Sequence, residues 1–375
     1  MGNLIPLTPS PRREGETGLP HIMGRDLRWG GVKNAFKINF IMANILITGA
    51  SGFIGSYLVE EGLKQGFKVY AGIRKSSSRK YLQDERIHFL EFDFSTREKV
   101  AGTLEECKKN NLRFQYIIHN AGLTKARRKE DFYNVNCKNT INFIEALIET
   151  AMVPDKFLFV SSLAAFGPGN PDTSDPVRLD HEPKPIELYG KSKLEAERYI
   201  TSLKDFPWLI VRPTGVYGPK EKDYFVFFQT INRGLEPYIG FRKQVLTFIY
   251  VRDLVRVIFL ALASPHVNKS WFVSDGNEYS SEEFARITKK ALGKKTLRIT
   301  VPLFIVRTIA TIGENVAALW GSTPTLNTDK YNVLKSTNWR CEFEPLQKDL
   351  GFQAEYDLEK GVEESLAWYK KEGWL

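Results

Sequence analysis

The residues best suited to chemistry in this 375-residue chain are Tyr189 and Lys193. They are four apart in a segment that predicts a helix, so both side chains should project from one helical face. A tyrosine with a pKa near ~10 is a poor base at neutral pH, and a nearby ammonium lowers that pKa by favouring the phenolate. Such a pair can move a proton to or from a hydroxyl or carbonyl oxygen. The alternative is an ordinary surface pair.

A third polar group is placed to act with this pair. Lys156–Val160 predicts a buried strand that ends at Ser161 and Ser162. Ligands of doubly wound sheets gather at the carboxyl ends of the strands. The hydroxyl of Ser162 could therefore hydrogen-bond the same substrate oxygen as Tyr189.

The element that must position this chemistry is the stretch from Asn44 to Gly55. An apolar run there stops at three glycines spaced three apart. Glycine lets the backbone turn tightly and lets a pyrophosphate come close, while free N–H groups and the helix dipole attract the anion. A plain tight turn is the alternative, but a helical pattern and a second strand, Phe67–Ile73, complete a βαβ unit. The predicted dinucleotide contacts here are Gly49, Ser51, Gly52, Phe53, Ile54 and Gly55.

The residue after the second strand bears on the choice of dinucleotide. An NAD site usually has an acid near this point for the ribose 2′-hydroxyl, whereas an arginine can accommodate a 2′-phosphate. Arg74 follows the strand and the acid is missing. This favours NADP over NAD, with an exposed basic loop as the alternative.

Two further strand ends supply candidate cofactor contacts. The predicted strand Ile87–Phe92 ends at Asp93 and Phe94, where a carboxylate could accept from an adenine amino group or could cap a helix. The predicted strand Gln115–His119 ends in small residues that let a cofactor lie against the sheet, namely Asn120, Ala121 and Gly122. A nicotinamide placed there would exchange a hydride with the carbon next to the oxygen that Tyr189 protonates.

The strand rhythm predicts an α/β fold, a doubly wound parallel Rossmann sheet with a smaller C-terminal substrate lobe. We predict a dinucleotide-binding domain over 42–218, with a returning strand near 271–274, and the lobe over 219–270 and 277–375. After the strand Trp208–Val211, a loop containing Pro213 should pass over the cofactor site. Residues 1–41 are expected to be a disordered leader or a start-site artefact. A helix is predicted from Asp131 to Ala151 and another from Leu358 to Lys371.

Composition excludes several classes of protein. The net charge is +9, but basic and acidic residues are interleaved, so nucleic acid is not an expected partner. Three scattered cysteines indicate free thiols, and five scattered histidines give no metal-ligand spacing. No stretch of 18 apolar residues predicts a spanning helix. Ile299–Leu319 is instead predicted as a packed helix of the lobe, with a membrane-surface helix as the alternative. We expect a cytoplasmic protein.

Together these motifs resemble the extended short-chain dehydrogenase/reductase family, also described as NAD-dependent epimerase/dehydratase proteins. The resemblance covers Ala43 to Leu375 and rests on five blocks in the family's order. These are 48–55 (TGASGFIG), Ser161-Ser162 with Phe166-Gly167, 189–193 (YGKSK), Arg212-Pro213 with 217–219 (YGP), and 248–254 (FIYVRDL). It implies a catalytic triad of Ser162, Tyr189 and Lys193, with Lys193 also binding the nicotinamide ribose. It further implies a structural or proton-relay role for Asn136, a small-molecule substrate and often a homodimer.

Departures from the family pattern narrow the predicted reaction. Leu163 and Ala164 stand where nucleotide-sugar dehydratases of this family carry an acidic pair, and Leu246 replaces an arginine that usually binds the substrate pyrophosphate in epimerases. The strand ending at Arg74 looks like the dihydroflavonol-reductase and 3β-hydroxysteroid-dehydrogenase branches. We therefore predict an NADP-dependent oxidoreductase that interconverts a carbonyl and an alcohol. The alternatives are a nucleotide-sugar 4-epimerase that retains NAD and a non-catalytic NADP-binding redox sensor.

Overall fold

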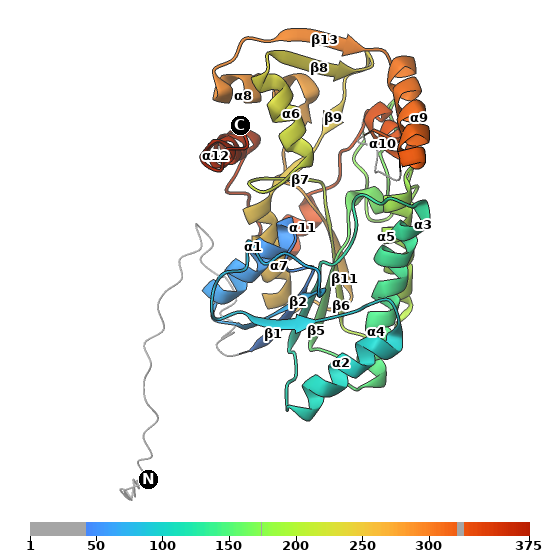
Figure 1. Cartoon of the computed structure of the whole chain (residues 1–375), viewed down its shortest axis with the longest axis vertical. Helices are drawn as coiled ribbons and strands as arrows, with labels where there is room; N and C mark the ends of the chain where they lie inside the picture. Colours follow the sequence, from blue (N-terminus) through green and yellow to red (C-terminus); the bar gives the residue numbers. More distant parts are fainter. Residues whose placement is uncertain (1–42, 174, 321–325) are drawn as a thin grey trace, which may run out of the picture. The chain divides into compact units, whose positions relative to one another are not determined.

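A seven-stranded parallel sheet organises the protein (Figure 1). The structure is a computed structural model and describes residues 43–173, 175–320 and 326–375, so the predicted leader lies outside the described residues. The strand order is β11-β6-β5-β4-β1-β2-β3. Their bounds are β1 (Asn44–Thr48), β2 (Lys68–Ile73), β3 (His88–Glu91), β4 (Tyr116–His119), β5 (Lys156–Val160), β6 (Trp208–Pro213) and β11 (Lys269–Val273).

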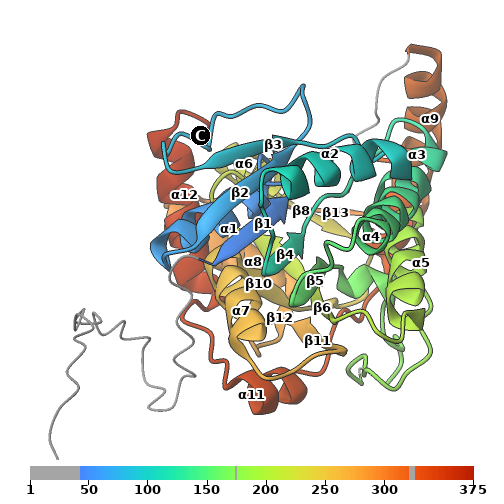
Figure 2. The same cartoon turned by 90° about the horizontal axis from the view of Figure 1, so that it is seen from below.

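Helices cover both faces of this sheet, as Figure 2 shows. One face packs against α1 (Phe53–Lys64), α7 (Val251–Ala263) and α11 (Glu344–Leu350). The other packs against α2 (Arg97–Lys109), α4 (Asn139–Glu149) and α5 (Leu188–Ser202). Apolar strands such as Phe157–Val160 are buried because both faces are covered. The predicted doubly wound fold is confirmed.

The helix predicted over Asp131–Ala151 is interrupted. It consists of α3 (Lys129–Tyr133), a π-helical turn (Asn134–Lys138) and α4. The side chain of Asn136 donates to the carbonyl of Leu123 at 3.0 Å and accepts from its N–H at 2.7 Å. This polar side chain is held by backbone outside its own helix, at the point where a π-turn inserts an extra residue.

A second group of elements lies beyond the carboxyl ends of the strands (Figure 1). It has its own aromatic core, built around Tyr217, Phe248, Phe284 and Tyr369. Its strands are β7 (Gly215–Tyr217), β8 (Leu235–Ile239), β9 (Val245–Leu246), β10 (Phe248–Tyr250), β12 (Tyr279–Ser280) and β13 (Leu297–Val301). Its helices are α6 (Asp223–Asn232), α8 (Ser281–Leu292), α9 (Leu303–Trp320), α10 (Thr328–Lys335) and α12 (Leu358–Lys371).

Two features bear on our expectations for this second group. The helix α7 falls within the range 219–270 that we predicted for the substrate lobe, and it packs with α1, β5 and β6 of the main sheet. The helix predicted from Ile299 begins instead at Leu303, because Ile299 pairs with Pro237 in the two-stranded β8–β13 ribbon. The division of the remaining residues between domain and lobe stays a prediction.

Candidate active site

The glycine turn after β1 has the shape that a phosphate requires. Gly49 has a φ of +66°, and a Cβ there would lie 2.8 Å from the carbonyl oxygen of Asn120. A Cβ on Gly55 would lie 2.1 Å from the carbonyl oxygen of Gly49, so α1 can start this close to the turn only with glycine. The first turn of α1 has no acidic residue, and Gly52 provides no side-chain cap. Its N–H groups are thus suited to an anion, and the turn fits a dinucleotide pyrophosphate.

The other predicted cofactor residues lie at four different strand ends. Asn120, Ala121 and Gly122 follow β4 beside the glycine turn, and the hydroxyl of Thr48 accepts from the N–H of Ala121 at 3.2 Å. Pro213 ends β6, and Arg74 is exposed after β2.

Asp93 and Phe94 differ from the others in their surroundings. The carboxylate of Asp93 binds the ammonium of Lys99 at 2.7 Å, and this pair lowers the pKa of Asp93 to about 2. The ring of Phe94 is buried and stacks on Phe92, with centroids 5.2 Å apart. That ring belongs to the core, so only the backbone of Phe94 is left for a ligand.

Tyr189 lies on α5 and borders a cavity between the carboxyl ends of the strands and the second group of elements. Ser162 and Pro213 border the same cavity, with the Ser162 hydroxyl near Tyr189. Burial raises the pKa of Tyr189 above its ordinary value, and the nearby hydroxyl of Ser162 only partly offsets this. Burial therefore dominates the pKa of Tyr189 in the protein without cofactor, and the phenol is protonated at neutral pH. That Lys193 favours the phenolate stays a prediction.

Lys193 is buried one turn further along α5. Its ammonium donates to the carbonyl of Val160 at 2.9 Å and lies over the ring of Phe159. A Cβ added to Gly122 would come within 3.2 Å of the Lys193 nitrogen, so the amine lies between the ends of β4 and β5. Burial lowers the pKa of Lys193 to about 8, because a charged ammonium is costly away from water.

A buried ion pair fixes α5 against the sheet. The guanidinium of Arg212, on β6, binds the carboxylate of Glu197, on α5, with its shortest contact at 2.8 Å. Glu197 also accepts from the hydroxyl of Ser161, and Arg212 donates to Ser270 at 2.9 Å. Sequence reasoning quoted Arg212 only as part of a motif and did not find Glu197. The position of Glu197 one helical turn after Lys193 could have indicated that it lies on the same face of α5.

The cavity has a volume of about 460 Å³ and is mostly apolar. Its charged groups were not predicted, because three of them follow residue 220 and have no motif around them. Lys125 and Lys330 both pair with Asp223, the second at 3.9 Å. Glu187 and Asp329 add two carboxyl groups, and burial raises the pKa of Glu187 to about 7. The cavity lining is completed by Thr124, Ala126, Phe132, Leu163, Ala164, Thr214, Gly215, Tyr224, Gln244, Leu246, Thr247, Phe248, Phe284, Asn327, Val333, Leu334 and Trp339.

The site combines a glycine turn suited to a dinucleotide, a buried lysine, and a tyrosine next to a serine. On a doubly wound sheet this combination is typical of dinucleotide-dependent enzymes, and comparison with known protein families shows which family this is. The sequence matches the NAD dependent epimerase/dehydratase family over residues 45–273, and the chain belongs to that family. It is an NAD(P)-dependent enzyme of the oxidoreductase and epimerase type, as predicted from the sequence.

Relatives of this chain carry out different reactions. It is 26% identical over 307 residues to a UDP-glucose 4-epimerase from Vibrio cholerae, covering 79% of this chain and 90% of that protein. It is 25% identical over 334 residues to a ceramide reductase from Caulobacter vibrioides, covering 88% and 96% respectively. A UDP-glucose 4-epimerase structure from Thermotoga maritima, with UDP-glucose, superposes with a TM-score of 0.70 at 21% identity, covering 88% and 99%. That last likeness shows the fold alone.

Proposed function

We propose that the protein uses NADPH to reduce a carbonyl group on an apolar, lipid-like substrate. The observation that carries this proposal is the lining of the cavity beside Tyr189. Among the described residues, this lining contains no arginine, and its two lysines already face the carboxylate of Asp223. With Glu187 and Asp329 also present, the cavity has more acidic than basic groups. A nucleotide-sugar pyrophosphate would be repelled there, whereas an uncharged chain would bury apolar surface.

Each catalytic side chain has a role in this reduction. The protonated phenol of Tyr189 donates a proton to the carbonyl oxygen of the substrate, and the hydroxyl of Ser162 holds that oxygen by a hydrogen bond. The ammonium of Lys193 stabilises the phenolate that remains and binds the ribose of the cofactor. When bound, NADPH would supply the hydride. Glu197 and Arg212 act only by holding α5, and with it Tyr189, in place.

The test of this role is Tyr189→Phe. We expect kcat to fall at least about 100-fold, because the proton donor is lost, with NADPH affinity nearly unchanged. Tyr199→Phe is the matched control, since this tyrosine lies on the same helix and its hydroxyl faces Glu145, 3.4 Å away. It should keep full activity. Retained turnover in Tyr189→Phe would remove tyrosine from the mechanism.

The choice of NADPH rests on Arg74. It is exposed directly after β2, and the residues that follow this strand, Arg74 to Ser78, include no acid that could bind a ribose 2′-hydroxyl. We expect Arg74→Ala to weaken NADPH binding about tenfold and to leave NADH binding unchanged, because only NADPH carries the 2′-phosphate. Fluorescence titration with both nucleotides measures this. Equal losses for both would contradict the assignment.

A nucleotide-sugar 4-epimerase is the second candidate, and the UDP-glucose 4-epimerase from Vibrio cholerae favours it. The two functions separate in one assay. NADPH oxidation with long-chain ketones, and no conversion of UDP-glucose, supports the reductase. Conversion of UDP-glucose to UDP-galactose without net cofactor consumption supports the epimerase. A homodimer and a cytoplasmic location also remain predictions.

A further inference from the structure

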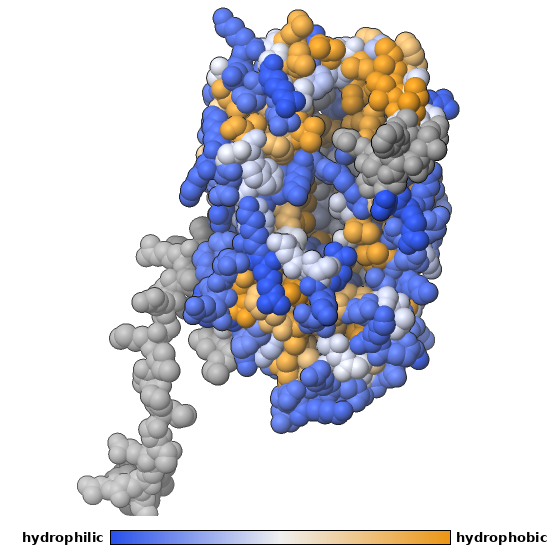
Figure 3. Space-filling model, viewed as in Figure 1, coloured by the Kyte–Doolittle hydropathy of each residue, from blue (hydrophilic) through white to orange (hydrophobic). Residues whose placement is uncertain are grey.

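Exposed apolar side chains gather at one end of the molecule. Eight of the twelve large hydrophobic side chains that are exposed in the described residues lie on β8, the loop after it, β13 and α9. Figure 3 shows these hydrophobic residues where Figure 1 places β8, β13 and α9. We call them the apolar patch: Leu235, Phe241, Leu297, Ile299, Phe304, Ile305, Ile309 and Ile312.

The β8–β13 ribbon contributes one whole face to the apolar patch. Leu235 pairs with Leu297, and the pairs Pro237–Ile299 and Ile239–Val301 follow in register on the same side. Glu236 and Tyr238 point to the other side and are buried. Leu297 is 67% exposed. The polar residues of β8 thus face inward and the apolar ones outward, which is the reverse of an ordinary surface ribbon.

The helix α9 is apolar on two sides. Val306 and Ala310 face inward and are 4% and 1% exposed. Ile305, Ile309 and Ile312 follow each other at helical spacing on the outer side, and the neighbouring Phe304 is 70% exposed. The inner row explains the predicted packing of this helix, whereas the described residues of the lobe leave the outer row exposed.

Ribbon and helix form a continuous surface. The N–H of Gly240, after β8, donates to the carbonyl of Val301 at 2.9 Å, just before α9 begins. A Cβ on Gly240 would lie 3.3 Å from the side chain of Leu303. The next residue, Phe241, is 82% exposed at this junction. An aromatic ring therefore projects where the ribbon meets the helix.

Basic residues border the apolar patch. Residues 294–313 contain Lys294, Lys295, Arg298 and Arg307 but no acidic residue, and Phe241 is followed by Arg242 and Lys243. Arg298 and Arg242 have carboxylate partners at 3.4 and 4.0 Å. The other four have no carboxylate of the described residues within 4 Å.

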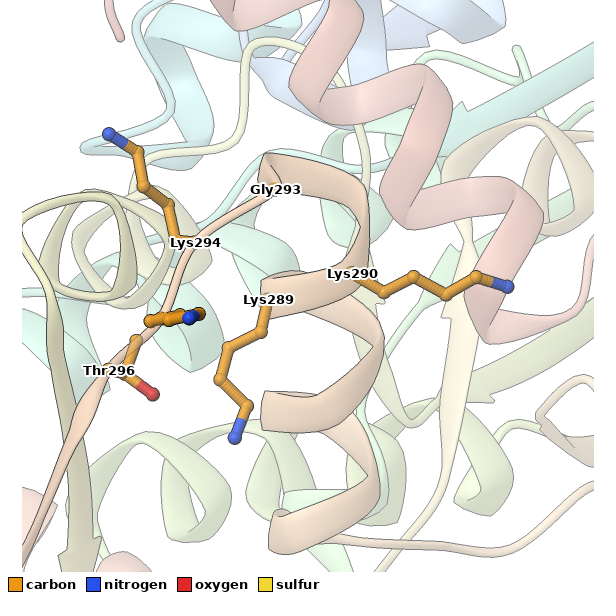
Figure 4. Close-up of a pocket in the computed structure, with 6 residues that line it drawn as sticks. Lys289, Lys290, Gly293, Lys294 and Thr296 are labelled. Atoms are coloured by element: carbon orange, nitrogen blue, oxygen red, sulfur yellow. The ribbon is translucent and has the colours of Figure 1, made fainter.

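The turn between α8 and β13 carries part of this positive charge. A hollow of about 520 Å³ beside it is lined by lysines, and Figure 4 shows Lys290 and Lys294 extending from it in different directions. Lys289 instead approaches Thr296, because both bind the carboxylate of Glu236, the lysine at 2.7 Å. No carboxylate of the described part of the chain pairs with Lys294, whose ammonium can therefore meet an external anion.

We propose that the apolar patch and its basic border dock the protein on the surface of an anionic lipid bilayer. Aromatic and aliphatic side chains next to lysine and arginine are the composition of interfacial membrane anchors. None of the described helices is long and apolar enough to cross a bilayer. A second copy of the chain is disfavoured as the partner, because a two-fold contact would bring the two basic borders together.

This inference concerns a binding surface and does not depend on the proposed reaction. The two are nevertheless compatible in space. The helix α10, which borders the cavity through Lys330, Val333 and Leu334, packs on α9. The hydroxyl of Thr328 donates to the carboxylate of Glu314 at 2.5 Å across this contact. One wall of the cavity is thus one helix away from the bilayer.

Vesicle co-sedimentation of the full chain tests the proposal. We expect binding to vesicles of phosphatidylcholine with 30% phosphatidylglycerol, and at least tenfold weaker binding to phosphatidylcholine alone, because the basic border needs anionic headgroups. Raising the salt concentration should weaken binding in the same way. Absence of binding to the anionic vesicles would overturn the proposal. If another part of the chain covers the apolar patch, the experiment gives this same negative result.

A pair of variants distinguishes docking through the apolar patch from nonspecific adsorption to vesicles. Ile309→Glu with Ile312→Glu places charge in the outer row of α9, and we expect it to reduce vesicle binding at least tenfold. Ile148→Glu is the matched control, since Ile148 is 47% exposed on α4, and it should bind as the parent does. Light scattering of both proteins then tests the alternative partner. Equal loss in both variants, or conversion of a dimer to a monomer by the α9 variant alone, would contradict docking on a bilayer. Vesicle binding is read without turnover, so failure of either proposal is recognisable independently of the other.

Discussion

At the level of single residues, Lys193 holds its ammonium where charge is costly. The ammonium of Lys193 donates a hydrogen bond to the carbonyl of Val160, and burial lowers the pKa of Lys193 to about 8. The folded protein therefore binds this proton less tightly than the unfolded chain, whose lysine pKa is near ~10.4. Below pH 8 the buried charge costs stability, and that cost is relieved as the pH rises from 8 toward the unfolded value.

The same pKa predicts a pH limit on turnover. The kcat/KM for carbonyl reduction, which reports groups of the free enzyme, should fall above about pH 8 as Lys193 loses its proton. A profile measured from pH 6 to 10 shows this, and Lys193→Arg should move the fall beyond pH 10 at a lower maximal rate, because arginine stays charged. A flat profile for the parent would show that the charge of Lys193 is not required.

At the level of elements, Gly190 sets the distance between α5 and the 3₁₀ turn Leu163–Ala165. A Cβ at Gly190 would lie 2.1 Å from the carbonyl oxygen of Ala164. We expect Gly190→Ala to push α5 outward, to cost about 1–3 kcal/mol of unfolding free energy, and to lower kcat at least about tenfold, because Tyr189 is the adjacent residue.

Gly102→Ala is the control for this substitution. Gly102 lies within α2, and no atom is within 4 Å of an added Cβ. Alanine there should leave kcat unchanged and stabilise the protein by about 0.4–1 kcal/mol. Thermal melts and steady-state rates of both variants measure the contrast. Full activity in Gly190→Ala would show that the position of α5 tolerates displacement.

Strands and helices were predictable where the buried residues also form a clear pattern in the local sequence. The strand Lys156–Val160 and the helix Leu358–Lys371 have the predicted bounds, because an apolar run and a helical stripe mark them. The π-turn at Asn134–Lys138 was not predictable, since it depends on the bond from Asn136 to the distant Leu123. The start of α9 was missed because Ile299 owes its strand to its pairing with β8.

At the level of the whole molecule, the site could be predicted only in part. Local motifs predicted Ser162 and the glycine turn, because each directly follows a strand whose end is fixed by the sheet. Tyr189 was predicted from its spacing to Lys193 on one helix, α5. The far wall of the cavity includes Asp329, Lys330 and residues up to Trp339, more than 100 positions after Tyr189. No periodicity in the sequence specifies such a contact, because it arises only when the second group of elements packs over the strand ends.

Asp253 is a residue on which this packing depends. It is fully buried on α7, and its carboxylate accepts from the N–H groups of Glu355 and Tyr356 at 3.0 and 2.9 Å. Arg256 donates to it at 2.5 Å. Since α7 packs on the main sheet and Tyr356 lies two residues before the first residue of α12, this acid joins the two groups of elements.

We therefore expect Asp253→Ala to lower the free energy of unfolding by about 3–5 kcal/mol, because two part-buried N–H groups lose their acceptor and Arg256 loses the buried one of its two carboxylate partners. Glu355→Gln is the matched control, since Glu355 pairs with the same Arg256 at 3.1 Å from a half-exposed position. That change should cost less than about 1 kcal/mol. Urea denaturation measures both. Equal losses of unfolding free energy in the two variants would mean that Asp253 contributes only its ion pair with Arg256. Its hydrogen bonds to the chain before α12 would then add nothing.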